Sequence, residues 1–393
     1  MAKMEAEGTD LEGPLMTTTA LPWDARARDL ADRLTKDGVL RDPAWRTALE
    51  ATPRHVFVPS FYRREPGCWV AVAGTEDWLD TVYSDSAVVT AIARMPNGEQ
   101  VPISSASEPS LMVRMLETLD IRDGHRVLEV GTGTGYNTAL LSRRLGGDHV
   151  YSIDIGADLV ESARERLATL GHHPTLTVGH GAQGVVGQAL FDRILVTCAV
   201  PAIPWAWADQ LKINGLVLAD LEAGSGAGSL VLLRRYPDRL EGRFLPDWAS
   251  FVPMRDADTA PEPPPRPSRV DEGAICWTDI DPTLPEERVP YFLAHTLIPP
   301  VLAMGERDEW ITFTARDGSW VEVRREPEAD GQRMVCQGGP VRVWDRFLRT
   351  HRLWAALGRP GWDRFGLTVT ADGYHRVWLD DPDGDFRWTL PPH

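Results

Sequence analysis

The sequence lacks the long apolar runs and the paired cysteines that would assign the chain to several common classes at once. No run of about eighteen apolar residues occurs, so no membrane-spanning helix is predicted. The start of the chain lacks the basic-then-apolar pattern of a secretion signal, and residues 1–22 are expected to form a flexible tail. Four cysteines (Cys68, Cys198, Cys276 and Cys336) are far apart and show no Cys-x-x-Cys spacing. This pattern argues against a metal site or a disulfide framework and is typical of a reducing cytoplasm.

Basic residues are scarce relative to acidic ones. The chain has 41 Lys and Arg against 57 Asp and Glu, and its formal net charge is −16. Because nucleic acid binding favours a basic surface, nucleic acid is not expected to be the main partner, although a local basic pocket remains compatible with this charge. No Gly-Lys-Ser or Gly-Lys-Thr phosphate loop occurs, and no evident His-Asp or Cys-His arrangement suggests nucleophilic catalysis. With 43% hydrophobic residues over 393 positions, the composition predicts a globular protein of about two domains.

From residue 109 onward, helical and strand patterns alternate. Helices are expected at residues 109–119, 138–146 and 157–171, and strands at 126–131, 149–155, 175–179, 191–200 and 215–221. Strands alternating with helices of this length predict right-handed crossovers and a parallel sheet covered on both faces. Residues 24–52 have helical spacing and precede this region, and "TPRHVFVP" after them is expected to be extended.

The last third of the chain has a different organisation. Residues 256–273 are rich in proline and charge and predict an extended linker between a domain at 23–255 and a smaller α+β domain at 274–393. Hairpins are predicted about Asp317-Gly318 and Asp372-Gly373, with a helix between them. Four aromatic residues on that helix and just after it are expected to form core, or in part an exposed peptide-binding face: Trp344, Phe347, Trp354 and Trp362.

The stretch "EVGTGTG" stands where the first predicted strand ends and its helix begins. Glycine there lets the backbone approach a ligand closely, and the helix N-terminus presents unpaired N–H groups. Asp154 ends the next strand, where an acid typically accepts hydrogen bonds from the ribose hydroxyls of a nucleotide-type cofactor. Glu129 before the loop would repel a pyrophosphate but suits a ligand with an amine and a sulfonium. The pattern therefore favours S-adenosylmethionine over a plain tight turn.

Several motifs resemble those of protein-L-isoaspartate O-methyltransferases. "LEVGTGTGYNTALL" and "VYSIDI" are similar to the cofactor motifs of that family. The family's other landmarks are matched in order by "TPRHVFVP", "VYSDSAVV", "SEPSLMVRML", "FDRILVTCAVPAIP" and "FVPMR". The resemblance covers residues 24–255 and implies a Rossmann-like S-adenosylmethionine-dependent methyltransferase fold. It also implies methylation of a side-chain carboxylate.

The same resemblance implies roles for individual residues. The residues expected to bind the cofactor are Glu129, Gly131, Thr132, Gly133, Gly135, Asp154, Ile155, His180 and Gly181. His180-Gly181 stands where the family often has Asp-Gly beside the adenine. Ser107 matches the serine of a Ser-x-Pro motif at the catalytic mouth, and Ser104 and Ser105 are expected to assist it. Tyr83, Asp85 and Thr197 are expected to border the substrate. No metal is expected.

The long C-terminal region is similar to that of family members associated with ribosomally made, modified peptides such as lanthipeptides. That likeness implies a cytoplasmic enzyme that methylates an aspartate in a macrocyclic precursor peptide, leading through a succinimide to isoaspartate. The alternatives are a general isoaspartate repair enzyme and a non-catalytic peptide-binding protein on the same fold. The sequence does not determine the target peptide or the oligomeric state.

Several of these residues can also have purely structural roles. A carboxylate is already ionised at neutral pH, so the reaction needs positioning and exclusion of water more than a base. Ser107 can orient that carboxylate or simply cap the helix that begins at Pro109. Ser104 and Ser105 can be loop residues, and Asp85 can be a surface acid.

Overall fold

The computed structural model describes residues 23–66, 68–95, 98, 100–188, 190–224, 227–246, 248–255, 273–284, 287–298, 301–307, 309–315 and 317–390. The predicted tail and residues 256–272 of the predicted linker lie outside the described residues. The chain divides into two compact units, and each is described separately. The described residues of the first unit are 23–198, 209–218 and 251–255, and those of the second are 199–208, 219–250 and 273–390.

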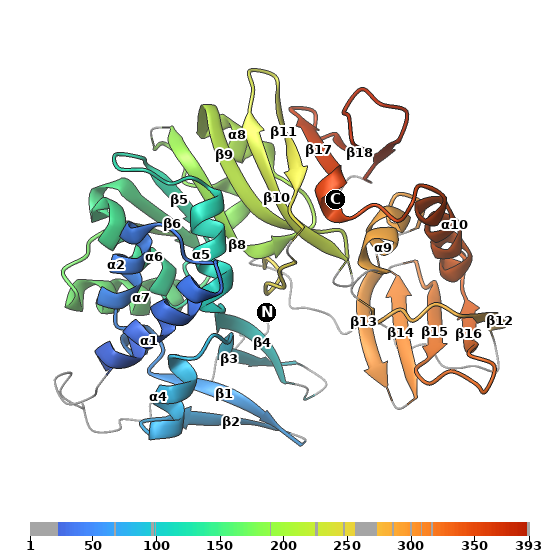
Figure 1. Cartoon of the computed structure of the whole chain (residues 1–393), viewed down its shortest axis with the longest axis horizontal. Helices are drawn as coiled ribbons and strands as arrows, with labels where there is room; N and C mark the ends of the chain where they lie inside the picture. The colour runs from blue at the N-terminus through green and yellow to red at the C-terminus, as the bar shows by residue number, and fades with distance from the viewer. Residues whose placement is uncertain are drawn as a thin grey trace, which may run out of the picture. The chain divides into compact units, whose positions relative to one another are not determined.

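The first unit contains the predicted parallel sheet (Figure 1). Its strands are β5 (Val127–Val130), β6 (Val150–Asp154), β7 (Thr175–Val178), most of β8 (Phe191–Val200) and the first part of β9 (Leu211–Glu222). Strands β8, β5, β6 and β7 pair in that order, all in parallel. All four residues of β5 are buried, as expected for a strand with both faces covered. The helices and short 3₁₀ turns between these strands are α5 (Pro109–Thr118), α6 (Tyr136–Leu145), η1 (Gly147–His149), α7 (Ala157–Thr169) and η2 (Gly181–Gln183).

Three helices begin the described chain: α1 (Trp23–Lys36), α2 (Pro43–Ala51) and α3 (Arg54–Phe57). Asp42 caps α2 by accepting a hydrogen bond of 2.8 Å from the Ala44 N–H. The prediction of an extended segment at "TPRHVFVP" was wrong, because residues 54–57 form one helical turn that buries both Arg54 and Phe57. The helical prediction for residues 24–52 is confirmed except for the break between α1 and α2.

A second, antiparallel sheet in the first unit was not predicted. Its strand order is β2-β1-β3-β4, with β1 (Ser60–Glu65), β2 (Cys68–Ala73), β3 (Val88–Arg94) and β4 (Gln100–Ala106), and α4 (Glu76–Val82) lies in the chain between β2 and β3. One face packs into a core that contains Phe61, Trp78 and Val88. The edge strand β4 carries Ser104 and Ser105 directly into α5.

The second unit is built mainly from antiparallel strands. Strands β10 (Gly228–Arg235), β11 (Arg239–Phe244), β17 (Phe365–Thr370), β18 (His375–Leu379) and β19 (Arg387–Thr389) pair in the order β10-β11-β17-β18-β19, and α8 (Trp205–Asp209) and η5 (Trp362–Arg364) complete this part. A five-stranded sheet has the order β12-β16-β15-β14-β13. Its strands are β12 (Ala274–Thr278), β13 (Val301–Arg307), β14 (Trp310–Ala315), β15 (Trp320–Arg324) and β16 (Arg333–Gly338).

Helices α9 (Arg288–Ala294) and α10 (Val343–Ala356) pack together, and α10 contacts β15 and β16 (Figure 1). Both predicted hairpins are confirmed, as β14–β15 and β17–β18. The four aromatic residues Trp344, Phe347, Trp354 and Trp362 are all buried, so they form core and not a binding face.

Strands β8 and β9 each contribute residues to both compact units. The domain boundaries at 255 and 274 stay a prediction. No helix in the described part of the chain is both long and apolar enough to cross a bilayer.

Candidate functional site

A pocket in the first unit collects most of the predicted site residues. The glycine loop, the end of β6, the serine stretch at the end of β4, the middle of β8 and residues 252–255 line it. The predicted residues among its walls are Ser104, Ser105, Ser107, Glu129, Gly131, Thr132, Gly133, Asp154, Ile155, Gly181 and Thr197. Tyr83, Asp85, Gly135 and His180 are not part of its lining. The structure thus places the predicted cofactor loop and the predicted serines in the lining of one cavity.

Thr197 fixes the start of the glycine loop. Its hydroxyl donates hydrogen bonds to the carbonyl oxygens of Gly131, at 2.8 Å, and Val130, at 3.1 Å. Gly131 has φ 101°, and a Cβ added there would stand 2.7 Å from the Thr197 Oγ1. Only glycine therefore fits at this position. Thr197 was predicted to border the substrate, and it does line the pocket while its hydroxyl holds the loop.

Gly135 is a packing residue behind the pocket. It has φ 86° and ends the loop at the N-cap of α6. A Cβ there would stand 2.9 Å from the Ala163 Cβ, so its absence lets α7 approach α6 closely. Its contact with the cofactor stays a prediction.

Glu129 is a completely buried carboxylate beneath the loop. One oxygen accepts from the Asn137 amide at 2.7 Å, and the other accepts from the hydroxyls of Ser152, at 2.7 Å, and Thr138. Burial raises the pKa of Glu129 to about 7, although these donors oppose the rise. Glu129 therefore joins β5, β6 and the first turn of α6, and a small change in its surroundings decides its charge.

Asp154 connects the loop to the end of β6. Its two oxygens accept hydrogen bonds of 2.9 Å from the backbone N–H groups of Gly133 and Gly156. A carboxylate has about four lone-pair sites, so acceptor capacity remains for hydroxyl groups of a ligand. The Arg255 guanidinium lies 4.0 Å from the Asp154 Oδ1. Arg255 was not predicted as a site residue, and its only sequence signal was its place in "FVPMR".

The serine stretch, residues 104–107, lies close to the glycine loop in the pocket lining. A Cβ added to Gly133 would stand 3.8 Å from the Ser105 carbonyl oxygen and 3.9 Å from the Ser104 Oγ. The Ser104 hydroxyl accepts from the Thr90 hydroxyl at 3.2 Å. The hydroxyls of Ser105 and Ser107 form no hydrogen bond with another residue that the structure describes. They are the two serine hydroxyls that can address a ligand.

The helix-capping alternative for Ser107 was wrong. Helix α5 begins at Pro109 and its N-cap residue is Glu108, whose side chain accepts from the Ser110 hydroxyl but from no backbone N–H of the helix. Instead, the Asp85 Oδ1 accepts a hydrogen bond of 2.8 Å from the Ser110 N–H. Asp85 therefore holds the first turn of α5 from a distant loop, a role that differs from both the predicted substrate contact and a surface acid.

Tyr83 lies in the core behind the serine stretch. Its hydroxyl is 2.8 Å from the His55 Nδ1, and both side chains are buried. Burial raises the pKa of Tyr83 and lowers the pKa of His55, so both groups are neutral at physiological pH. Tyr83 thus supports the substrate wall without lining it. His180 similarly caps η2, where its Nδ1 accepts from the Ala182 N–H at 3.1 Å.

Arg54 is the functional residue that sequence reasoning missed. Its side chain is completely buried, and burial lowers the pKa of its guanidinium. It donates to the carbonyl oxygens of Val82, Ser84, Ser86, Ala106 and Ser107, at 2.6 to 3.5 Å, and lies 5.7 Å from the centre of the Tyr136 ring. One side chain therefore joins the loop after α4, the serine stretch and the start of α6.

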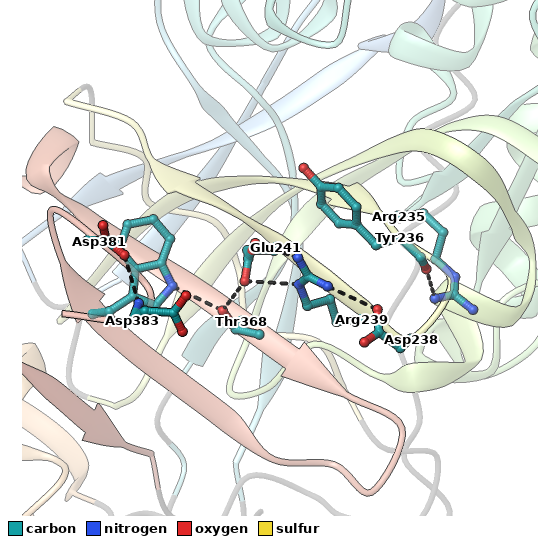
Figure 2. A network of polar contacts seen from close by, with 9 residues as sticks. Arg235, Tyr236, Asp238, Arg239, Glu241, Thr368, Asp381 and Asp383 are labelled. Atoms are coloured by element: carbon teal, nitrogen blue, oxygen red, sulfur yellow. Dashed lines mark hydrogen bonds and ion pairs between the residues drawn. The ribbon is translucent and has the colours of Figure 1, made fainter.

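A second cavity, in the second unit, has charges that satisfy one another (Figure 2). The Arg239 guanidinium is 3.1 Å from both Asp238 and Glu241. The Thr368 hydroxyl donates to Glu241 at 2.8 Å and accepts from the Trp378 indole at 3.1 Å. This region is consistent with a solvated strand surface. Within the described ranges, no cluster of three or more His, Cys, Asp or Glu side chains is arranged to hold a metal ion.

Comparisons with known proteins identify relatives of residues 25–257. The family model for protein-L-isoaspartate(D-aspartate) O-methyltransferase matches residues 25–257. A protein-L-isoaspartate O-methyltransferase from Methylorubrum extorquens is 37% identical over 232 residues, which are 59% of this chain and 88% of the relative. Another, from Methanothermobacter thermautotrophicus, is 34% identical over 59% of this chain and 95% of its own.

Similarity to a solved structure extends further along the chain. A structure of a protein-L-isoaspartate O-methyltransferase aligns with 90% of this chain and 100% of its own, with a TM-score of 0.54 at 21% identity. At this identity the likeness shows the fold alone. The predicted Rossmann-like methyltransferase fold with additional C-terminal α+β structure is confirmed.

Proposed function

Because the chain belongs to the protein-L-isoaspartate(D-aspartate) O-methyltransferase family, we propose that it methylates the side-chain carboxylate of isoaspartyl residues in peptides and proteins. The enzyme is an S-adenosylmethionine-dependent carboxyl O-methyltransferase. The observation that carries the proposal is that one pocket is lined both by the glycine loop and by Ser105 and Ser107, whose hydroxyls bond to no described residue.

The residues around the pocket fit S-adenosylmethionine. Asp154 would hold the ribose hydroxyls with the lone pairs that Gly133 and Gly156 leave unused. Gly181 packs closely within the pocket lining, because a Cβ there would stand 2.7 Å from Val130 and 3.0 Å from Met254. Glu129 lies beneath the loop, where its ionised form would favour a cationic amine. When bound, the cofactor supplies an electrophilic methyl group.

The chain's own task is to orient a carboxylate that is already ionised. A side-chain carboxyl has an ordinary pKa near 4, so no base must remove a proton at neutral pH. The Ser107 and Ser105 hydroxyls would donate hydrogen bonds to one carboxylate oxygen and leave the other free to react. Met112 and Ile103 on the same pocket wall help to exclude water. Positioning and dehydration are therefore the proposed sources of catalysis.

The ester product can react further without the enzyme. The backbone nitrogen of the following residue attacks the ester carbonyl, methanol leaves with the nitrogen's proton, and a succinimide forms. Water then opens the succinimide to a mixture of aspartyl and isoaspartyl peptide. This sequence would return part of the damaged residues to ordinary linkage.

A second candidate is maturation of a ribosomally made peptide, in which an ordinary aspartate is methylated in a macrocycle. The observations that favour it are the three serines at 104, 105 and 107 and the residues beyond 257, which the family model does not match. It is the less well supported candidate, because the relatives at 37% and 34% identity are both named protein-L-isoaspartate O-methyltransferases. A cytoplasmic location stays a prediction from the cysteine pattern.

Four matched peptides test these candidates. Purified protein and S-adenosylmethionine are incubated with linear and macrocyclic peptides that carry either aspartate or isoaspartate at one position, and masses are followed. Methylation of the linear isoaspartyl peptide supports the proposed function. Methyl gain and net water loss only on the cyclic aspartyl peptide would overturn it in favour of peptide maturation.

Two variants connect the activity to the pocket. Ser107→Ala should lower kcat/KM by about 10- to 100-fold, because it removes a hydrogen bond to a charged group. Its affinity for S-adenosylhomocysteine, measured by calorimetry, should stay unchanged. Asp154→Asn should instead weaken that affinity. Wild-type protein that binds no S-adenosylhomocysteine would support the third alternative, a non-catalytic peptide-binding protein.

A further inference from the structure

Helix α10 presents a row of arginines on its exposed face. The arginine stripe consists of Arg342 at the N-cap and Arg346, Arg349 and Arg352 in the helix, all exposed. Their spacings of four, three and three residues place neighbouring members one turn apart, so the stripe is about 15 Å long. The opposite face of α10 is buried through residues such as Trp344, Phe347 and Trp354. The stripe is therefore held on a rigid, well-anchored element.

These arginines have no acidic partners among the residues that the structure describes. Elsewhere in the described chain arginines commonly pair with acids, as Arg239 does with Asp238 and Glu241 in Figure 2. The acid on α10 itself, Asp345, accepts a hydrogen bond of 2.7 Å from the Gln337 amide. His351 of the same helix is 3.2 Å from Glu287. The charges of the stripe are thus left for a partner outside the described fold.

The composition makes this row of unpaired cations unusual. The chain carries 57 acidic residues against 41 basic ones, so acids to neutralise the stripe are abundant. Like charges one helical turn apart also destabilise a helix by a few tenths of a kcal/mol per pair. The fold keeps the stripe in spite of both facts, which is expected if a ligand compensates its charge.

Charge complementarity selects the kind of ligand. Arginine binds carboxylates through two parallel hydrogen bonds, which makes it well suited to acidic side chains. An extended peptide presents every second side chain on one face, about 6.7 Å apart, close to the 4.5 to 6 Å rise between neighbouring arginines of the stripe. A net charge of −16 repels the continuous phosphate backbone of nucleic acid at longer range.

We propose that the arginine stripe of α10 binds an acidic segment of the peptide substrate, outside the residue that is methylated. This inference rests on the proposed function for its substrate class. It gives the second unit a role in substrate selection, since peptides with closely spaced acidic residues would be retained in preference to neutral ones.

A binding experiment tests the stripe without requiring methylation. The probe is a fluorescein-labelled peptide with glutamates at alternate positions and no aspartate or asparagine, mixed with the full-length protein. The variant Arg342→Gln/Arg346→Gln/Arg349→Gln/Arg352→Gln should bind it about tenfold more weakly by fluorescence anisotropy. A matched control removes four exposed arginines elsewhere: Arg28→Gln/Arg94→Gln/Arg143→Gln/Arg387→Gln. Thermal unfolding confirms that both variants are folded.

Three outcomes decide the proposal. A loss confined to the stripe variant, together with weaker wild-type binding at high salt, supports it. Equal losses in both variants would mean that only net charge matters and would overturn it. Tighter binding of a single-stranded oligonucleotide of equal charge would overturn it as well. A reversed stripe, with glutamate at the four positions, should prefer a lysine peptide and so keeps the test valid if the glutamine variant fails to fold.

Kinetics separate this proposal from the proposed function. Two isoaspartyl peptides are compared that differ only in an acidic or a glutamine-rich flank. A lower KM for the acidic flank in the wild type, lost in the stripe variant, supports the proposal. Equal KM values with normal turnover would overturn the proposal for the arginine stripe and leave the proposed function intact. Absence of turnover with intact binding of the fluorescent probe would instead overturn the proposed function.

Discussion

Replacing Arg54 by methionine should destabilise the protein and displace the serine wall, the part of the pocket lining that is formed by residues 104–107. Arg54 donates to five buried or partly buried carbonyl oxygens, and the two shortest contacts are to Val82, at 2.6 Å, and Ser107, at 2.9 Å. Each hydrogen bond from a charged donor contributes about 1.5 to 3 kcal/mol, so these two contribute about 4 kcal/mol. Methionine also avoids the burial of a charge, which returns about 1 kcal/mol. The expected loss in the free energy of unfolding is therefore about 3 kcal/mol.

The effect on activity should exceed the effect on cofactor binding. Arg54 contacts the Ser107 backbone, whereas the proposed cofactor contacts lie on Asp154 and the glycine loop. A displacement of about 1 Å at a positioning group can lower the rate by about a hundredfold. We expect kcat of Arg54→Met to fall 10- to 100-fold while the affinity for S-adenosylhomocysteine changes less than threefold. Arg54→Lys, which keeps the charge, should lie between this variant and the wild type.

Denaturant unfolding measures the stability, calorimetry the affinity for S-adenosylhomocysteine, and steady-state kinetics kcat. Rescue of activity by added guanidinium ion is a fourth test. Guanidinium at concentrations below those that unfold the protein should partly restore the activity of Arg54→Ala, because it can occupy the vacated site and donate to the same carbonyls. Wild-type stability and kcat in Arg54→Met would refute the reasoning. An equal loss in cofactor affinity and kcat would show that Arg54 supports the whole pocket and not the serine wall.

Burial raises the pKa of Glu129 from 4.5 to about 7. The folded state is therefore stabilised by the protonated Glu129 below pH 4.5, and this stabilisation is lost as the pH rises through about 7. In pH-dependent denaturation, the wild type should lose about 3 kcal/mol relative to Glu129→Gln between pH 4.5 and 7.5, and parallel curves would contradict the buried geometry. Gly131→Ala should weaken binding of S-adenosylhomocysteine at least tenfold, because its Cβ would stand 2.7 Å from the Thr197 Oγ1 at a φ of 101°. Adding Thr197→Ala should recover part of that affinity in calorimetry. No recovery would mean that the loss comes from backbone strain at residue 131 and not from the clash with the Thr197 hydroxyl. Asp85→Ala should lower stability by about 1 kcal/mol in urea unfolding through loss of the cap on the Ser110 N–H, and Asp85→Asn should lose less.

Local patterns were sufficient to predict the elements that carry the glycine loop and Asp154 into the pocket lining. The strand, the glycine turn and the helix that follow one another around Gly131 depend on neighbours in sequence, and Asp154 is fixed by the end of the next strand. The contacts of Arg54 were not predictable in the same way, because its carbonyl acceptors lie 28 to 53 residues further along the chain. Because every residue has a backbone carbonyl, the sequence does not show which carbonyls accept a hydrogen bond. The distant cap at Asp85 escaped prediction for the same reason.

The antiparallel sheet was missed because its strands have weak patterns. β2 reads "CWVAVA" with its residues exposed or half-buried, and β1 ends in charged residues, so neither shows the clean alternation of a strand with one buried face. The peptide-maturation reading drew on the length of the chain after residue 257. Length alone does not separate the two candidates, since the family model ends at residue 257 and does not match the residues beyond it.

The pocket's two sides belong to different sheets. The glycine loop and Asp154 extend from the parallel sheet, whereas Ser104 and Ser105 stand on β4, an edge strand of the antiparallel sheet. Substitutions in β3 and β4 can therefore reshape the acceptor side while leaving the hydrogen bonds of the donor side intact. Such a separation makes the enzyme easy to diversify: acceptor preference can drift between relatives, or be selected in a library confined to residues 88–106, without rebuilding the methyl-donor site.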